Sequence, residues 1–235
     1  MKVIGLIGGM SWESSAEYYR IINEEVKRKL GGLHSAKCLL YSVDFEEIEH
    51  LQAKGEWTKA GQLLGEVACS LEQGGADLIV LCTNTMHKVI HYIEEKINVP
   101  ILHIADATAN DIQRANIRTV GLLGTKYTME QDFYKVKLQA QGIKVLTPEE
   151  QERECVHRVI YDELCLGQVQ PSSKFTYQQV IEHLVERGAE GIILGCTEIG
   201  LLIQQEDVRV PLFDTTQIHA RTAVERALGE KEYDL

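Results

Sequence analysis

The sequence predicts an α/β fold made of two pseudo-symmetric, doubly wound lobes with mainly parallel sheets. Short runs rich in Val, Ile and Leu alternate with longer helical patterns, as expected for βα units. Segments of the first half recur in order in the second half, which indicates an internal duplication. The chain has 235 residues, of which 44% are hydrophobic, and this is enough for two lobes that each have a core.

Eight strands and several helices follow from these patterns. The expected strands are residues 3–7, 38–42, 78–81, 101–103, 119–123, 144–146, 191–194 and 212–213. The helical stretches between them include residues 16–29, 58–73, 85–95, 131–141 and 177–187.

Three pairs of segments carry the evidence for duplication. VIGLIGGMS near residue 3 is echoed by TVGLLGTKYT near residue 119, and GADLIVLCTNT from Gly75 by GAEGIILGCTE from Gly188. NVPILHIADAT is echoed by RVPLFDTTQIH. We therefore expect one lobe at residues 1–105, joined by a C-terminal helix at 216–235, and a second at 106–215. The lobes are expected to face each other across a cleft that holds the active site, because open α/β sheets bind ligands at the carboxyl ends of their strands.

Composition argues against several classes of partner. The formal net charge is −11 and no basic run is present, so neither a nucleic acid nor an anionic membrane surface is an expected partner. The apolar stretch at residues 3–9 is too short for a signal segment or a membrane span, which favours a cytoplasmic protein. The six cysteines lack CxxC spacing, so no metal site or disulfide framework is expected. The GLIGG segment lacks the GxGxxG spacing of a dinucleotide loop.

The duplicated segments place residues with chemical potential at equivalent strand ends. Aligning Gly75 with Gly188 pairs Thr83 with Cys196, Asn84 with Thr197 and Thr85 with Glu198. Backbone N–H groups at the start of a helix favour a bound carboxylate, and the helix dipole lowers the pKa of a thiol there. Cys196 is therefore expected to be a thiolate. The alternative is that residues 195–197 form only a tight turn containing a small residue.

These motifs resemble the aspartate/glutamate racemase family, and the resemblance covers essentially the whole chain. It rests on GCTEIG at residues 195–200, CTNT at 82–85 and GLIGGMSWESS at 5–15. Within the family it most resembles bacterial broad-specificity amino-acid or L-aspartate/glutamate racemases. Glutamate racemases of peptidoglycan synthesis are similar but typically carry a His where this chain has Glu198, which points away from a dedicated cell-wall enzyme. The resemblance implies an amino-acid substrate, a homodimer and no cofactor.

Racemisation without a cofactor needs one group to remove the α-proton and another to return a proton to the opposite face. Members of the family usually use two cysteines, whereas here the first position is Thr83. Cys82 comes one residue too early, so its side chain should point to the opposite face of the strand. A threonine hydroxyl is a poor base near neutral pH. We therefore expect Cys196 to take the α-proton of the L-enantiomer, with slow reaction from the other enantiomer.

The remaining expected site residues would form the substrate shell. They are Met10, Ser11, Gln52, Asn84, Thr85, Thr125, Thr197 and Glu198. Ser11 could equally cap the helix that follows it, and Glu198 could equally be a first-turn acid of its own helix. His87 is expected to be a hydrogen-bonded structural residue.

Substrate choice depends on a segment that reads Glu163-Leu164-Cys165-Leu166-Gly167. Archaeal aspartate racemases of the family carry a Lys where this chain has Leu166, and that Lys holds the side-chain carboxylate of the substrate. Strict aspartate specificity is therefore not expected, which leaves glutamate, homoserine or other small amino acids. Alternatively, Leu166 belongs to a helix core and another cation binds the carboxylate.

Other activities fit the same pattern. A decarboxylase of the arylmalonate type keeps only the second cysteine, because it needs only one proton donor. Maleate isomerase-like and hydantoin racemase-like activities normally require two. Duplicated α/β lobes also suit a non-catalytic amino-acid-binding protein.

Overall fold

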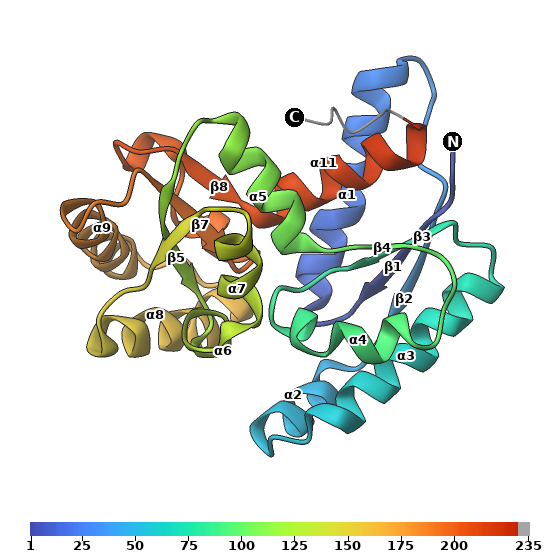
Figure 1. The fold of residues 1–235 in the computed structure, drawn as a ribbon, viewed down its shortest axis with the longest axis horizontal. Helices are drawn as coiled ribbons and strands as arrows, with labels where there is room; N and C mark the ends of the chain where they lie inside the picture. The colour runs from blue at the N-terminus through green and yellow to red at the C-terminus, as the bar shows by residue number, and fades with distance from the viewer. Residues whose placement is uncertain (230–235) are drawn as a thin grey trace. The chain divides into compact units, whose positions relative to one another are not determined.

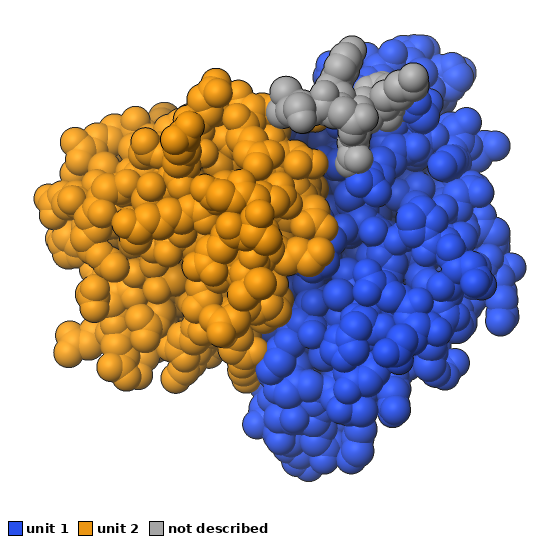
Figure 2. Space-filling view, viewed as in Figure 1, with its two compact units in different colours: residues 1–103, 219–235 blue, residues 104–218 orange. Residues whose placement is uncertain are grey.

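The computed structural model describes residues 1–229 and divides the chain into two compact units (Figure 2). Unit 1 contains residues 1–103 and the C-terminal segment from His219, and unit 2 contains residues 104–218. Each unit holds a four-stranded sheet in which all strands are parallel (Figure 1). The prediction of an α/β fold with two parallel sheets is thus confirmed. Residues 230–235, the end of the expected C-terminal helix, lie outside the described residues.

The sheet of unit 1 has the strand order β2-β1-β3-β4. Its elements are β1 (Ile4–Gly8), α1 (Trp12–Leu30), β2 (Cys38–Ser42), α2 (Phe45–Ala53), α3 (Trp57–Gln73), β3 (Leu78–Leu81), the 3₁₀ helix η1 (Thr85–Val89), α4 (Ile90–Glu94) and β4 (Ile101–Leu102). The final helix, α11 (Thr215–Leu228), begins in unit 2 and continues into unit 1. Alternate strand residues point to opposite faces. Ile4 and Leu6 therefore pack with α1 and α11, whereas Ile7 packs with α2 and α3.

The sheet of unit 2 has the equivalent order β6-β5-β7-β8. Its elements are α5 (Ile104–Arg114), β5 (Thr119–Gly124), α6 (Lys126–Glu130), α7 (Asp132–Ala140), β6 (Lys144–Leu146), α8 (Glu150–Asp162), η2 (Leu164–Leu166), α9 (Pro171–Glu186), β7 (Gly191–Gly195), α10 (Ile199–Leu202), η3 (Gln205–Asp207) and β8 (Leu212–Asp214). Val120 and Leu122 pack with α5 and α7, and Leu123 packs with α8 and α9. Both sheets are therefore covered on both faces, which explains their continuous apolar strands.

The duplication extends to individual hydrogen bonds. Asp77 precedes β3, and its carboxylate accepts a hydrogen bond from the backbone N–H of Val3 at 2.6 Å. Glu190 precedes β7, and its carboxylate accepts one from the N–H of Thr119 at 2.9 Å. In both units the turn before this acid contains a glycine with positive φ, +97° at Gly75 and +100° at Gly188, a conformation that glycine adopts without steric cost. The same short sequence thus starts the central strand of each unit.

Three predicted helices differ in extent from those observed. Helix α1 begins at Trp12, four residues before the predicted start at 16. The stretch 85–95 was expected to be one helix, but it is a 3₁₀ helix followed by a short α-helix, because the backbone of Val89 (φ −109°, ψ 16°) leaves the α region between them. Helix α9 begins six residues before the predicted start at 177. Its first turn has Pro171 at a position where a missing N–H costs no hydrogen bond. Ser172 and Phe175 are exposed, so the first turns show no apolar periodicity.

Among the helices of residues 1–229, none combines the length and the apolar character needed to span a bilayer.

Three buried histidines lie together in unit 1 next to the points where the chain passes between units. The Nε2–H of His219 donates to the carbonyl of Leu102 at 2.9 Å, and its Nδ1 accepts from the hydroxyl of Tyr18 at 2.9 Å. A carbonyl can only accept, so Nε2 of His219 carries a proton, and the hydroxyl of Tyr18 can donate to Nδ1 of the neutral ring. The ring of His87 lies 4.6 Å from that of His103 and 5.8 Å from that of His219, centroid to centroid. Burial, reinforced by His87, lowers the pKa of His219 to about 3.

This low pKa predicts a pH-dependent contribution to stability. The folded protein keeps His219 neutral while the unfolded chain binds a proton below about pH 6.5, so stability falls as the pH falls. Between pH 8 and pH 5 the contribution of His219 should fall by about 2 kcal/mol. The groups around it are Tyr18, His87 and Arg226. The stability gap between wild type and H219Q, measured by urea unfolding, should narrow by this amount, and a constant gap would contradict the assignment.

The two repeats also predict different costs for equivalent glycine substitutions. A Cβ at Gly5 would lie 2.7 Å from Cδ1 of Ile79 and 2.8 Å from Cβ of Ala76, whereas at Gly121 it would meet the flexible ends of Ile192 and Leu184 at 2.6 and 2.9 Å. The Cβ of Ala76 cannot move without its backbone. We expect G5A to destabilise by about 2–3 kcal/mol and G121A by about 1–2 kcal/mol, as for overpacked cores. Urea unfolding of both variants tests the order, and equal or reversed costs would refute it.

Candidate active site

The end of the central strand pair of unit 2 determines where Cys196 lies. Gly124, the last residue of β5, pairs with Gly195, the last residue of β7. A Cβ at Gly195 would approach the carbonyl oxygen of Leu123 to 2.7 Å, so this position has no room for a side chain. The side chain of Thr128, from α6, packs over both glycines. Thr125 and Cys196 therefore follow directly at neighbouring strand ends.

Cys196 is hydrogen-bonded to a buried carboxylate. Its Sγ–H donates to Oε2 of Glu198 at 2.9 Å, and the hydroxyl of Thr197 donates to the same oxygen at 2.7 Å. Glu198 is only 5% exposed, whereas Cys196 and Thr197 are partly exposed. The carboxylate thus holds the thiol and the hydroxyl in fixed positions.

The expectation that the helix start lowers the pKa of Cys196 is wrong. Burial raises the pKa of this thiol well above its usual range, and the charge of Glu198 and then the neighbouring Cys165 raise it further. Helix α10 has four residues, so its dipole is small compared with an adjacent carboxylate. The resting thiol is therefore protonated, with Glu198 as the acceptor of its hydrogen bond. Cys165 was not among the expected site residues, because η2 and β7 are brought together only by the fold.

At the end of β3 in unit 1, the thiol faces the core and a hydroxyl takes the place that the thiol has in unit 2. Cys82 is fully buried in the core between the sheet and helices α1 and α11, and burial raises the pKa of its thiol. Thr83 follows and is partly exposed. The carbonyl of Thr83 accepts a hydrogen bond from Nδ1 of His87 at 2.8 Å. Cys82 therefore faces the core, as its place on the strand predicts, and His87 supports the turn that carries Thr83.

The hydroxyls expected to contact substrate both cap helices. Oγ of Ser11 accepts from the N–H of Ser14 at 3.3 Å, and Oγ1 of Thr125 accepts from the N–H of Thr128 at 3.4 Å. The capping alternative for Ser11 is thus confirmed.

The other expected residues of unit 1 lie in or beside its core. Met10, Asn84 and Thr85 are buried. Gln52 lies on α2 and donates from Nε2 to the sulfur of Met86 at 2.9 Å, which brings this helix against η1. The structure thus gathers the predicted residues at the carboxyl edges of two sheets. Met10, Ser11, Gln52, Thr83, Asn84 and Thr85 belong to unit 1, and Thr125, Cys196, Thr197 and Glu198 belong to unit 2.

Leu166 is not a core residue. It lies in η2 and is 66% exposed, so the alternative that it belongs to a helix core is wrong. No charge stands at this position.

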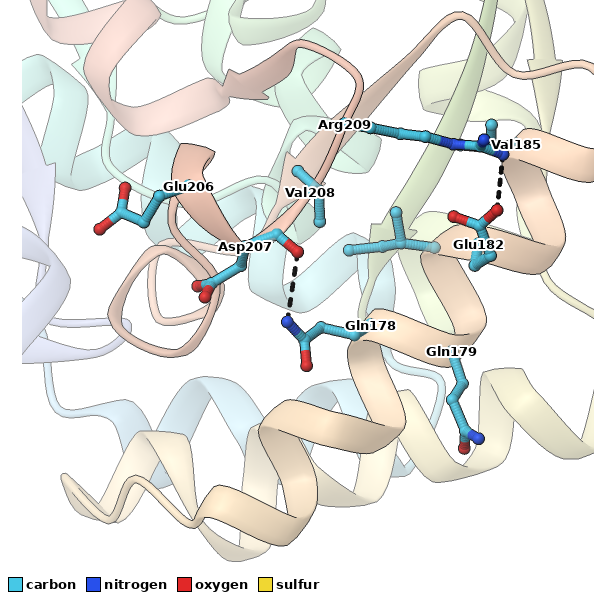
Figure 3. A pocket seen from close by; sticks show the side chains of 9 residues that line it. Gln178, Gln179, Glu182, Val185, Glu206, Asp207, Val208 and Arg209 are labelled. Atoms are coloured by element: carbon cyan, nitrogen blue, oxygen red, sulfur yellow. Dashed lines mark hydrogen bonds and ion pairs between the residues drawn. The ribbon is translucent and has the colours of Figure 1, made fainter.

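A groove of unit 2 lies away from these residues (Figure 3). It has a volume of about 570 Å³ and lies between α9 and the segment that leads into β8, at the amino edge of the sheet. Its polar groups bind one another, because Gln178 donates to the carbonyl of Asp207 at 3.2 Å and Arg209 pairs with Glu182 at 2.5 Å. Ligands of parallel sheets bind at the opposite edge. Within residues 1–229, no three His, Cys, Asp or Glu side chains converge to hold a metal ion.

Together these features define a duplicated α/β protein that presents a thiol, a carboxylate and hydroxyls at the carboxyl edges of its sheets. The chain belongs to the Asp/Glu/hydantoin racemase family, whose sequence model matches residues 7–223. It is 58% identical to a Yersinia pestis protein described as an Asp/Glu racemase, with a TM-score of 0.92 over 97% of this chain and 100% of that one. An aspartate racemase homologue from Pyrococcus horikoshii is 38% identical, with a TM-score of 0.86 and the same coverage. The broad-specificity amino-acid racemase RacX of Bacillus subtilis is 22% identical over 97% of this chain and 99% of its own length.

The Cys196–Glu198 contact predicts a reactivity change of defined sign. Replacing Glu198 by Gln removes a negative charge that raises the pKa of the thiol, so more thiolate is present at pH 8. We expect iodoacetamide to alkylate Cys196 about tenfold faster in E198Q, because the thiolate is the reactive form. Peptide mass spectrometry follows this cysteine separately from the other five. E206Q, at an exposed glutamate of η3, should leave the rate unchanged, and slower alkylation of E198Q would disprove the assignment.

Proposed function

We propose that this protein is a cofactor-independent amino-acid racemase in which Cys196 and Thr83 are the two proton-transfer groups. The observation that carries the proposal is the Cys196 thiol, hydrogen-bonded to buried Glu198 at the end of a central strand. The equivalent position of the other repeat carries the hydroxyl of Thr83. Membership of the racemase family supports the same reaction.

The proposed proton transfers balance as follows. Glu198 accepts the proton of the Cys196 thiol, and the resulting thiolate removes the α-proton of an L-amino acid to give a planar carbanion. Thr83 donates its hydroxyl proton to the opposite face of that carbon and takes a proton from water at the same time. Cys196 is then a thiol again, and Glu198 releases its proton to solvent, where it neutralises the hydroxide left by the water and restores the carboxylate for the next cycle. The high pKa of the resting thiol makes Glu198 essential to the first step.

The two directions should differ in rate. A thiol has an accessible anion, whereas a threonine hydroxyl has none near neutral pH, so abstraction by Thr83 from the D-enantiomer is slow. We propose aspartate or glutamate, or a broader set that includes homoserine, as substrates, held by Met10, Ser11, Gln52, Asn84, Thr85, Thr125, Thr197 and Glu198. The similarity to RacX supports the broader set. We also propose a homodimer, by analogy with the family.

One observation favours a second candidate function, that of a decarboxylase. Only one of the two equivalent strand-end positions carries a thiol, and a decarboxylase of the arylmalonate type needs only one proton donor. Assaying arylmalonate consumption beside amino-acid racemisation distinguishes the two. A protein that only binds amino acids would change neither compound.

Exchange of the α-proton with deuterated solvent tests the proposed direction. The L-enantiomer should exchange at least tenfold faster than the D-enantiomer, and C196S should abolish exchange from L by removing the base. T83C should accelerate exchange from D, because it supplies a second thiol. NMR of separate L and D samples measures each rate. Equal rates in the wild type, or unchanged exchange in C196S, would rule out the proposed roles.

A further inference from the structure

Lys126 is a cation that lies just after the carboxyl end of a strand. Of the eight strands, only β5 is followed within two residues of its carboxyl end by a lysine or arginine in the described part of the chain. The other strand ends carry small, apolar, hydroxyl, acidic or imidazole side chains. Because ligands of parallel sheets bind at this edge, the charge of Lys126 lies where a substrate would be held.

The strand register places Lys126 beside the candidate thiol. Gly124 pairs with Gly195, and neighbouring strands lie about 4.8 Å apart. Lys126 is two residues beyond Gly124, and Cys196 is one residue beyond Gly195. The backbones of Lys126 and Cys196 are therefore close enough for one small molecule to contact both side chains.

No carboxylate neutralises this charge in the described residues. Lys126 is exposed, and among residues 1–229 it forms no ion pair, while the nearby Glu130 is engaged by Arg153 at 3.2 Å. The N–H of Lys126 donates to Nδ1 of His157 at 3.3 Å, so this ring nitrogen carries no proton. Burial and the charge of Lys126 lower the pKa of His157, and the ring is neutral at pH 7. The imidazole therefore supports the loop without adding a second charge.

A second lysine close to a strand end is already engaged. Lys88, on η1, lies 3.7 Å above the ring of Trp57, and burial lowers its pKa. A cation held over an indole gains a stabilising interaction that a ligand would have to replace. Lys126 has no such interaction, so binding an anion there costs less.

We propose that the ammonium group of Lys126 binds the side-chain carboxylate of an acidic amino-acid substrate, which makes Lys126 a specificity-determining residue. This inference rests on the proposed function of the same site. A charge-assisted hydrogen bond from an ammonium to a carboxylate is about twice as strong as a neutral one. A local cation is needed here because the chain has a net charge of −11, which disfavours the approach of dicarboxylates. The uncharged, exposed Leu166 leaves this role to another residue.

The test compares acidic and neutral substrates in the variant K126M, which keeps the length of the side chain and removes its charge. For L-glutamate and L-aspartate, kcat/KM for α-proton exchange should fall about 10- to 100-fold, mainly through KM, as for loss of a hydrogen bond to a charged group. For L-homoserine it should change less than twofold. K126R, which keeps a cation, should retain most of the activity on glutamate.

The matched control is K144M. Lys144 is also exposed, but it begins β6 and so lies at the amino edge of the same sheet. This variant should behave as wild type with every substrate. The inference fails if K126M loses the same activity on glutamate as on homoserine, or if it loses activity on neither substrate. In either case Lys126 does not recognise the side-chain carboxylate of the substrate.

A second measurement separates failure of the racemase proposal from failure of the inference about Lys126. If wild type exchanges the α-proton of no amino acid, calorimetric titration with L-glutamate and L-homoserine still tests Lys126. Weaker binding of glutamate alone in K126M, with K144M unaffected, would support the inference without any catalysis. Equal binding of glutamate by wild type and K126M, or no binding by either, would overturn it.

Discussion

The pairing of the last residues of β5 and β7 is the constraint on which the rest of the candidate site depends. Parallel strands end at one edge of a sheet, so the residues that follow Gly124 and Gly195 lie side by side. Both positions are glycine, and Gly195 has no room for a Cβ against the carbonyl of Leu123. Thr128 closes over the pair from α6. Cys196 and Lys126 are thus positioned by backbone hydrogen bonds and close packing, with no need of contact between their own side chains.

Duplication explains how one scaffold can carry two different chemistries. The acids before the central strands, Asp77 and Glu190, bind backbone N–H groups and so keep the register of each sheet. Such contacts do not involve the residues after the strands, which are free to differ. One repeat therefore ends in a buried thiol followed by the Thr83 hydroxyl, and the other in glycine followed by the Cys196 thiol. A thiol and a threonine hydroxyl have unequal acidities, and this inequality is the basis on which we propose a reaction that favours one enantiomer.

The environment of Cys196 keeps its proton rather than releasing it. Removing a thiol from water disfavours its anion, and a carboxylate next to it does so further. The same carboxylate, Glu198, accepts the S–H hydrogen bond and can receive the proton when a substrate is present. His219 of unit 1 is neutral for a related reason, since burial disfavours its charged form. In unit 1, the ring of His87 supports the turn at Thr83 through a hydrogen bond to its carbonyl.

Much of the fold is determined by the sequence alone. All eight strands were predicted within one residue at each end, because buried parallel strands are short apolar runs bounded by turn residues. The duplication, the strand-end position of Cys196 and the inward direction of Cys82 followed from repeats and from strand alternation. Tertiary structure decided the rest: the raised pKa of Cys196, the exposure of Leu166 and the place of Lys126 beside the thiol. Each depends on segments that are far apart in the chain, such as 124–126 and 195–198, and no local pattern records the burial or the register that brings them together.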